Sequence, residues 1–247
     1  MIAPHAAMAE LVDALDSGSS RGNSVEVRLF LAAMEKILVI ANGAPPSAPL
    51  FERLAQEHDK LVAVDGGLHA CLQYNHEPDL IIGDFDSVSP NLRTELTHLK
   101  QIYTPDQNKS DLEKALEYLF REENPAVITV LGALSQRLDH TLVNLYLLCL
   151  YPGKVIFETE TERCMALLQN TSLSCTPGQL FSLIPFSQAT NVVTSGLQWE
   201  LNDVTLFKQF FSLSNKCLNT QVTITFSSGD LIACLGPAIP AQKFPLV

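Results

Sequence analysis

Leu80-Ile81-Ile82-Gly83-Asp84-Phe85-Asp86-Ser87 is the stretch of sequence that decides the fold of this chain. Its apolar start predicts a strand buried on both faces, as strands of parallel sheets are. Two carboxylates follow at once, and ionised carboxylates are costly to bury unless a cation compensates their charge. Asp65 follows a second apolar run, and Asp111 opens a predicted helix. Together these acids indicate a site built around a divalent metal ion.

Apolar runs alternate with helical periodicity on both sides of this stretch. We expect strands at 36–41, 61–64, 79–82, 100–103, 126–131 and 154–158, and helices at 49–58, 67–74, 90–98, 109–121 and 138–150. In the last helix four leucines form one apolar stripe: Leu138, Leu142, Leu145 and Leu148. This alternation predicts an α/β domain over residues 34–158, with a mostly parallel, Rossmann-like sheet and helices on both faces.

The character of the sequence changes after about residue 160. Short β-prone runs at 163–168, 180–184, 190–194, 221–226 and 231–235 are separated by turns such as Pro177-Gly178 and Ser228-Gly229. This pattern is typical of a β-sandwich. We therefore expect a second, all-β domain over residues 163–247, joined to the first near residues 158–163.

Residues 1–33 differ from the rest of the chain. Residues 17–24 are a polar tract of the flexible kind, and the stretch as a whole looks like a translation across a transfer-RNA gene. A strand then begins cleanly at Met34. We expect residues 1–33 to be a non-native or disordered extension, with Met34 as the true start.

Composition narrows the possible functions. The 247 residues are 47% apolar, which is enough for a substantial core. The net charge is −11 and no basic stripe is present, so we expect no nucleic-acid partner. Apolar runs fall well short of the roughly 20 residues that a membrane helix needs, so we expect no membrane association. The six cysteines contain no CxxC pair, as in an ordinary reduced protein of the cytoplasm.

Several polar segments follow the predicted strands. Ligands of open α/β sheets bind outside the carboxyl ends of the strands, where Asn42-Gly43, Asp65-Gly66-Gly67 and residues 83–87 are expected. A double glycine alone is more often a tight turn. The two acidic segments among them, together with the segment that contains Asp111, favour a functional site.

Two further segments contribute candidate residues. Asp111 alone would be a helix cap about as often as a site residue, but Ser110 is an equally good cap and would leave Asp111 free. Arg137-Leu138-Asp139-His140 opens a helix, where an anion site and an exposed Arg beside a capping Asp139 are equally plausible. With Mg²⁺ between the acids, such a site can bind polyphosphate. No GxxxxGK[ST] loop is present, so the chain is not a P-loop enzyme.

The ordered set of segments resembles the thiamine pyrophosphokinase family. That family combines DGG, GDFDS, PDQ…TD and G…R-x-DH segments, which stand here at 65–67, 83–87, 105–111 and 132–140. The similarity continues in Gly196-Leu197-Gln198-Trp199 and Ser212-Leu213-Ser214-Asn215, and it covers about residues 35–236. The resemblance implies a nucleotide-binding α/β domain, a thiamine-binding β-sandwich and a homodimer with the thiamine site near the subunit interface.

The resemblance also implies an activity and its residues. The reaction is transfer of the pyrophosphoryl group of MgATP to the thiamine hydroxyl, releasing AMP. The implied Mg²⁺ ligands are Asp84, Asp86 and Asp111, which with Arg137 form the catalytic set. The residues implied for ATP are Asn42, Asp65, Gly66, Gly83, Ser110, Arg137 and His140. Those implied for thiamine are Gln107, Asp139, Trp199 and Ser214. No general base is evident, and a metal role makes Asp86 and Asp111 weak candidates.

Some alternatives stay open. Trp199, the only tryptophan, would be a core residue about as often as a platform for the cationic thiazolium. Asn108, Lys109 and the Ser135-Gln136 pair depart from the pattern of the family. Rival functions are a pyrophosphokinase for a pterin alcohol, a catalytically dead thiamine sensor, and a nucleotide hydrolase that uses water as acceptor.

Overall fold

The computed structural model describes residues 34–88, 96–134 and 137–238. The expected extension over 1–33, the Ser135-Gln136 pair and residues 90–95 of the expected helix 90–98 lie outside these ranges. Residues 96–98, the end of that expected helix, form a turn.

The N-terminal half is a parallel sheet, as expected. Its strands are β1 (Lys36–Ile40), β2 (Lys60–Val64), β3 (Leu80–Gly83), β4 (Lys100–Tyr103), β5 (Val127–Leu131) and β6 (Val155–Glu158). Their order is β6-β5-β1-β2-β3-β4, and every neighbouring pair is parallel. The chain thus fills one side of β1 first and then returns to the other side, which creates a topological switch point between β1 and β5.

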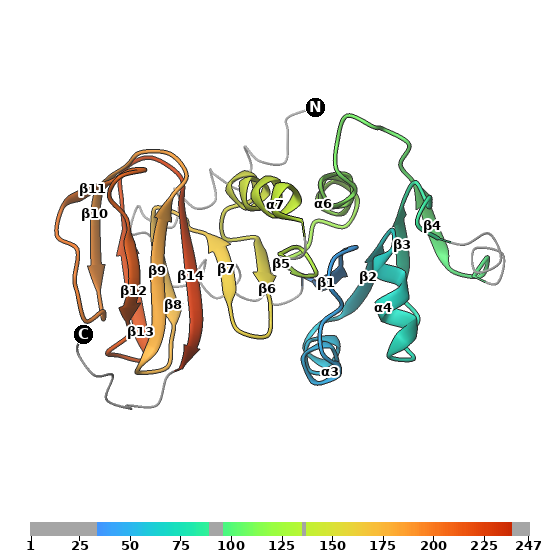
Figure 1. The fold of residues 1–247 in the computed structure, drawn as a ribbon, viewed down its shortest axis with the longest axis horizontal. Helices are drawn as coiled ribbons and strands as arrows, with labels where there is room; N and C mark the ends of the chain where they lie inside the picture. The colour runs from blue at the N-terminus through green and yellow to red at the C-terminus, as the bar shows by residue number, and fades with distance from the viewer. Residues whose placement is uncertain (1–33, 89–95, 135–136, 239–247) are drawn as a thin grey trace, which may run out of the picture.

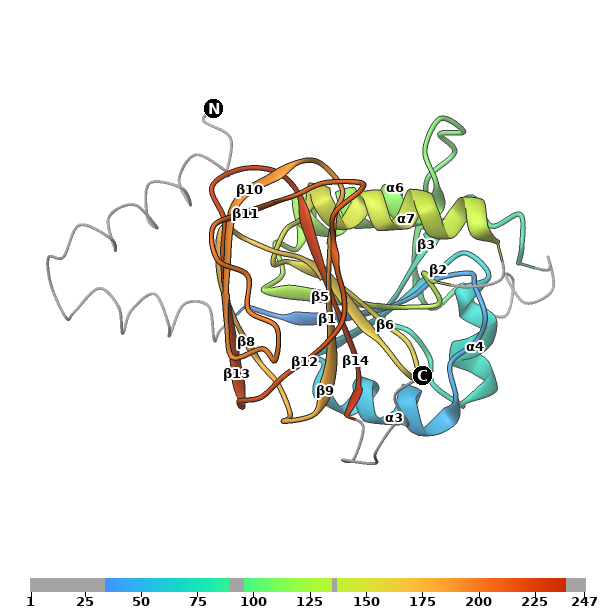
Figure 2. The same cartoon turned by 60° about the vertical axis from the view of Figure 1, so that its left-hand side comes forward.

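Helices cover both faces of this sheet (Figure 2). They are α3 (Ala48–Glu57) and α4 (Gly67–Gln73) on one face, and α6 (Asp111–Glu122) and α7 (Leu138–Leu150) on the other. Successive residues of β1 alternate between the two cores: Ile37 packs on the side of α6 and α7, and Leu38 on the side of α3 and α4. Burial on both faces explains why these strands are apolar runs rather than alternating patterns.

The C-terminal half continues the same sheet and adds a second one. Antiparallel strands β7 (Arg163–Ala166), β14 (Leu231–Ala238), β9 (Gln179–Pro185) and β12 (Ser212–Lys216) extend it to ten strands. The second sheet has the order β11-β10-β13-β8, with β11 (Val204–Leu206), β10 (Ala189–Ser195), β13 (Gln221–Thr225) and β8 (Asn170–Ser174). Buried residues such as Phe181, Val192 and Ile224 form the core of this sandwich.

The two halves share one hydrogen-bonded sheet, because β6 pairs with β7 at the expected junction. Figure 1 shows the sandwich at one end of the molecule and β3 and β4 at the other. The division into domains at 158–163 stays a prediction. None of the helices in the described ranges has the length and apolar character that a membrane span needs.

Helix α7 differs from expectation in the direction of its leucine stripe. Leu148 is buried, but Leu138 is 72% exposed and Leu142 is 50% exposed. The helix instead buries Asn144, Leu147 and Leu148 against the sheet. Because this helix is apolar on nearly every side, periodicity alone could not identify the face that packs on the sheet.

Gly132, the first residue after β5, lies close to the backbone that follows β1. Its φ is +75°, and a Cβ there would lie 2.7 Å from the carbonyl oxygen of Ala41. We expect Gly132→Ala to lower the free energy of unfolding by about 2–4 kcal/mol, since left-handed strain and a backbone clash add. Urea denaturation measures this loss.

Gly153→Ala is the matched control for that substitution. Gly153 also has a positive φ, +69°, but its Cβ would meet only the flexible side chain of Leu168, at 3.2 Å. We expect a loss of about 1–2 kcal/mol from strain alone. Equal losses in the two variants would contradict the close approach of β5 and β1.

Candidate active site

The segments singled out in the sequence meet at one edge of the parallel sheet. Asn42 follows β1, Asp65 follows β2 and Asp84 follows β3, while the loop 104–110 follows β4 and residues 132–134 follow β5. At the switch point the amide of Ala41 donates to the carbonyl of Leu131 at 2.9 Å. Crevices at such points are where open α/β sheets bind ligands.

An acidic cluster occupies this edge. Asp65, Asp84 and Asp86 each offer a carboxylate oxygen, and these oxygens all lie within 4.8 Å of one another. Asp65 is buried, and its Oδ1 has no hydrogen-bond partner. Three carboxylate oxygens with one buried, unsatisfied acceptor suit a hard divalent cation such as Mg²⁺. The residues present therefore fit the metal that the sequence predicts.

The protonation of the cluster is set by burial and by local donors. Burial raises the pKa of Asp65, and the charges of Asp111 and Asp86 raise it further. The pKa of Asp84 is lowered, chiefly because the backbone N–H of Asp86 donates to its carboxylate at 3.2 Å. The amide of Gln107, 3.2 Å from Asp84 Oδ2, contributes to this lowering. Asp84 therefore stays ionised more readily than Asp65.

Two residues of the cluster segments adopt left-handed backbone. Asp65 has φ 47° and Phe85 has φ 65°. Such conformations cost of order 1–3 kcal/mol for residues other than glycine, so the surroundings must hold them. The amide of Asp65 donates to the carbonyl of Ile82 at 2.9 Å, and the buried ring of Phe85 stacks on Tyr103. These contacts present the acids at the sheet edge.

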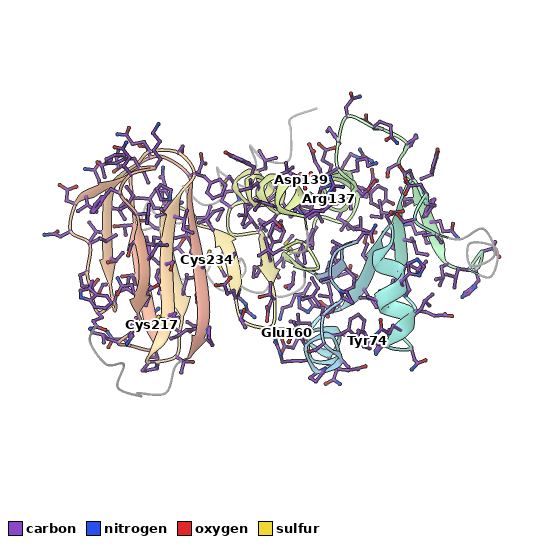
Figure 3. All side chains as sticks on the ribbon, in the orientation of Figure 1. Tyr74, Arg137, Asp139, Glu160, Cys217 and Cys234 are labelled. Carbon is purple, nitrogen blue, oxygen red and sulfur yellow. The ribbon has the colours of Figure 1, made fainter. Side chains whose placement is uncertain are left out.

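The loop that follows Asn42 is held from two sides. The hydroxyl of Tyr74 donates to the carbonyl of Pro46, and Glu160 accepts from the backbone N–H of Ser47 at 2.7 Å. Figure 3 labels both anchors, Tyr74 at the C-cap of α4 and Glu160 on the hairpin between β6 and β7. The amide of Asn42 itself lies 3.4 Å from Asp65 Oδ2, so this residue joins the cluster directly.

Asp111 lies at the start of α6, with Ser110 as the helix cap. The hydroxyl of Ser110 accepts from the backbone N–H of Glu113 at 3.2 Å, as expected, which leaves the carboxylate of Asp111 free of a capping role. Asp111 instead forms an ion pair with Lys114, with 2.7 Å between Oδ1 and Nζ. The side chain of Asn108 turns to Asp106, at 2.9 Å, and not to the cluster.

Arg137 and Asp139 bind each other at the start of α7 (Figure 3). The guanidinium donates twice, from Nε at 3.2 Å and from Nη2 at 2.6 Å. Asp139 also accepts from the backbone N–H of His140 at 3.0 Å. These donors, the guanidinium above all, lower the pKa of Asp139 to about 2. The expected phosphate-binding arginine is thus exposed and paired with a carboxylate.

Trp199 is presented to the surface by the sandwich. Its side chain is 57% exposed, so the core alternative does not hold. The side chain of Asn215, which is buried, accepts from the backbone N–H of Trp199 at 3.1 Å and donates to its backbone carbonyl at 2.7 Å. Its neighbour Ser214 is exposed, has φ 55°, and donates its N–H to Ser182 at 3.0 Å. The aromatic ring is therefore carried on a fixed backbone.

Trp199 and the acids lie far apart within one chain. Asn215, which holds Trp199, belongs to β12, while Asp84 follows β3. The sheet order β12-β9-β14-β7-β6-β5-β1-β2-β3 puts eight strand spacings between them. At about 4.8 Å per spacing this is roughly 38 Å along the sheet. Figure 1 shows the two strands at opposite ends.

Sequence reasoning missed three polar residues that hold the site. They are Lys114 on α6, Asn144 on α7 and Asn215 on β12, all buried. Asn144, for example, donates to the carbonyl of Ala133 at 2.8 Å and so holds the backbone just after β5. Of the three, only Asn144 stands among apolar neighbours in the sequence, and this was the available signal, since buried polar groups need partners.

Comparisons with known proteins match both halves of the chain. The family model "Thiamin pyrophosphokinase, catalytic domain" matches residues 51–157, and "Thiamin pyrophosphokinase, vitamin B1 binding domain" matches residues 170–231. Thiamine pyrophosphokinase 3 of Oryza sativa subsp. japonica is 30% identical over 231 residues, covering 79% of this chain and 84% of the relative. Thiamine pyrophosphokinase of Bacillus subtilis (strain 168) is 27% identical, covering 81% and 97%.

Solved structures agree in fold. The thiamin pyrophosphokinase of Geobacillus thermodenitrificans superposes with a TM-score of 0.72 at 22% identity, covering 82% of this chain and 97% of that one. The Candida albicans enzyme gives 0.70 at 21% identity, covering 84% and 90%.

Proposed function

The chain belongs to the thiamine pyrophosphokinase family, and from this premise we propose how its residues transfer the pyrophosphoryl group of ATP to thiamine. The thiamine hydroxyl oxygen bonds to the β-phosphorus of ATP, the bond from that phosphorus to the AMP oxygen breaks, and the hydroxyl proton is lost. The observation that carries the proposal is the cluster of Asp65, Asp84 and Asp86 at the switch-point edge of the sheet.

The cofactor that this cluster suits is Mg²⁺. Asp84 and Asp86 belong both to the expected ligand set and to the observed cluster, so they would hold the ion. Asp65 and Asp111 add negative charge beside them. When bound, the ion would offset the charge of the polyphosphate and of the departing AMP.

The nucleotide side of the site is residues 34–158. Arg137 would exchange Asp139 for phosphate oxygens, because a guanidinium binds both partners with the same two-pronged geometry. That exchange frees Asp139 for thiamine. The remaining ATP contacts that we propose follow the strands at the same edge: Asn42, Asp65, Gly66, Gly83, Ser110 and His140.

The acceptor side includes residues 163–247. A cationic thiazolium is attracted to the exposed face of Trp199, beside Ser214. Gln107, held by Asp84, would face the other ring of thiamine. Because roughly 38 Å separates β12 from β3 along the sheet, one small acceptor cannot reach Trp199 and Asp84 of the same chain.

We therefore propose a homodimer whose sites each combine the acids of one copy with Trp199 of the other. The exposed apolar side chains of α7, Leu138, Leu142, Val143, Tyr146 and Leu150, support an interface between copies, since such faces are normally covered. All six cysteines are free thiols, which supports a reducing location such as the cytoplasm.

The test is the acceptor dependence of AMP release by the purified chain with MgATP. We expect AMP and thiamine diphosphate in equal amounts with thiamine, and no comparable AMP with a hydroxymethylpterin or with water alone. Preference for the pterin would support the pterin enzyme, and AMP without an acceptor would support a hydrolase. No AMP under any condition would support the thiamine sensor.

A further inference from the structure

Lys114 is a buried cation beside the acidic cluster. Its side chain is only 6% exposed, although it stands on α6 among the buried apolar residues Leu112, Ala115 and Leu116. A lysine is rarely buried unless its charge has partners. The burial of Lys114 must therefore be explained by the groups that bind its ammonium group.

The partners of Lys114 come from two directions. Its Nζ donates to the carbonyl of Thr104 at 2.9 Å and to the carbonyl of Asp106 at 3.1 Å. It also lies 2.7 Å from Asp111 Oδ1, an ion pair outside hydrogen-bond geometry, since that oxygen has no hydrogen-bond partner. One ammonium group thus joins the start of α6 to the loop that follows β4.

That loop carries a residue expected to face the acceptor. Gln107 follows Asp106 directly, and its amide donates to Asp84 Oδ2 at 3.2 Å. The two carbonyls bound by Lys114 stand on either side of Pro105, which has no N–H and cannot anchor the loop through a backbone donor. The N–H of Thr104 donates to the carbonyl of Gly83 at 2.9 Å, and the ammonium group adds the anchor that holds the backbone from Thr104 to Asp106, directly before Gln107.

We propose that Lys114 is a positioning residue for the acceptor: it holds the loop 104–106 so that Gln107 stays against Asp84 and faces thiamine. The inference rests on the proposed function, because the role of Gln107 toward thiamine belongs to it. Lys114 itself touches neither substrate. The charge of Lys114 also helps to lower the pKa of Asp84, in accord with its place beside the cluster.

The test replaces Lys114 with methionine in the full-length protein, which keeps an unbranched side chain but removes the charge and all three donors. We expect the KM for thiamine to rise about tenfold while the KM for ATP changes less than threefold, because one positioned hydrogen bond to the acceptor is lost. Buried ion pairs can be replaced by apolar residues without loss of the fold.

A second readout needs neither activity nor nucleotide. Trp199 is the only tryptophan, so quenching of its fluorescence reports thiamine binding directly. We expect the Kd for thiamine to rise about tenfold in Lys114→Met, while the Kd for Mn²⁺ alone, by titration calorimetry, stays within threefold. If the methionine variant fails to fold, Lys114→Gln, which keeps donors but no charge, replaces it and should show the same separation.

Lys60→Met is the matched control. Lys60 pairs with Glu123 in another shielded ion pair. It is the first residue of β2, at the amino-terminal edge of the parallel strands, whereas the site lies at their carboxyl ends. The KM and Kd for thiamine should therefore not change. Unchanged thiamine binding in the Lys114 variants would overturn the proposal, and so would loss of thiamine and Mn²⁺ binding together. If the unaltered protein does not use thiamine, the proposed function fails instead.

Discussion

Asp84→Asn is expected to lower the thiamine-dependent release of AMP roughly a thousandfold, since a charge is removed where phosphoryl transfer needs it. The substitution keeps the shape of the side chain, and its one oxygen can still accept from the backbone N–H of Asp86, although the bond that Oδ2 accepts from Gln107 is lost. Asp84 is also the member of the cluster whose pKa is lowered, so it supplies full charge at neutral pH. Steady-state AMP release with MgATP and thiamine measures the effect.

Asp79→Asn controls for the same change at the other end of the same strand. Asp79 precedes β3 and accepts from the backbone N–H of Leu61 at 2.8 Å, a role that an asparagine oxygen can fill. We expect near-normal turnover from this variant. Circular dichroism and the melting temperature should match the unaltered protein for both. Near-normal turnover by the Asp84 variant would show that the metal assignment is wrong.

Trp199→Ala is expected to lower kcat/KM for thiamine about thirtyfold, mostly through KM. A desolvated cation on an indole face contributes about 2 kcal/mol, which corresponds to that factor. The backbone contacts that Asn215 makes with residue 199 do not involve the ring, so the local structure should survive. Initial rates over a range of thiamine concentrations give the two constants separately.

Trp199→Phe supplies the graded comparison. Phenylalanine keeps an aromatic face with a weaker attraction for cations, so its KM should fall between those of the unaltered protein and the alanine variant. An unchanged KM for thiamine in the alanine variant would rule out the tryptophan as the acceptor platform.

The parallel sheet and its site segments were predictable because their signals are local. A strand buried on both faces is a continuous apolar run, and all six expected strands are present. Glycine and aspartate directly after such runs mark the carboxyl edge, which is why Asp65 and Asp84 meet there. The cap at Ser110 followed from the same local chemistry.

Features that depend on distant partners were not predictable. Strands β8, β11 and β12 were missing from the expected set, because half-exposed strands of a sandwich have weak patterns. The exposed leucines of α7 could not be predicted either, because the sequence does not show which face of this helix is covered. The burial of Lys114 depends on the carbonyls of Thr104 and Asp106, eight to ten residues earlier, and the local sequence carries no signal for that contact.

In the proposed dimer, the acids of one copy and Trp199 of the other form one site. To test this, the Asp84→Asn and Trp199→Ala proteins are mixed in equal amounts, dissociated and allowed to reassociate. AMP release is then measured at a thiamine concentration well below the KM of the unaltered protein. Half of the dimers would be mixed, and one of their two sites would combine intact acids with an intact tryptophan. We expect recovery of about one quarter of normal AMP release. A mixture no more active than the average of its two components would contradict it.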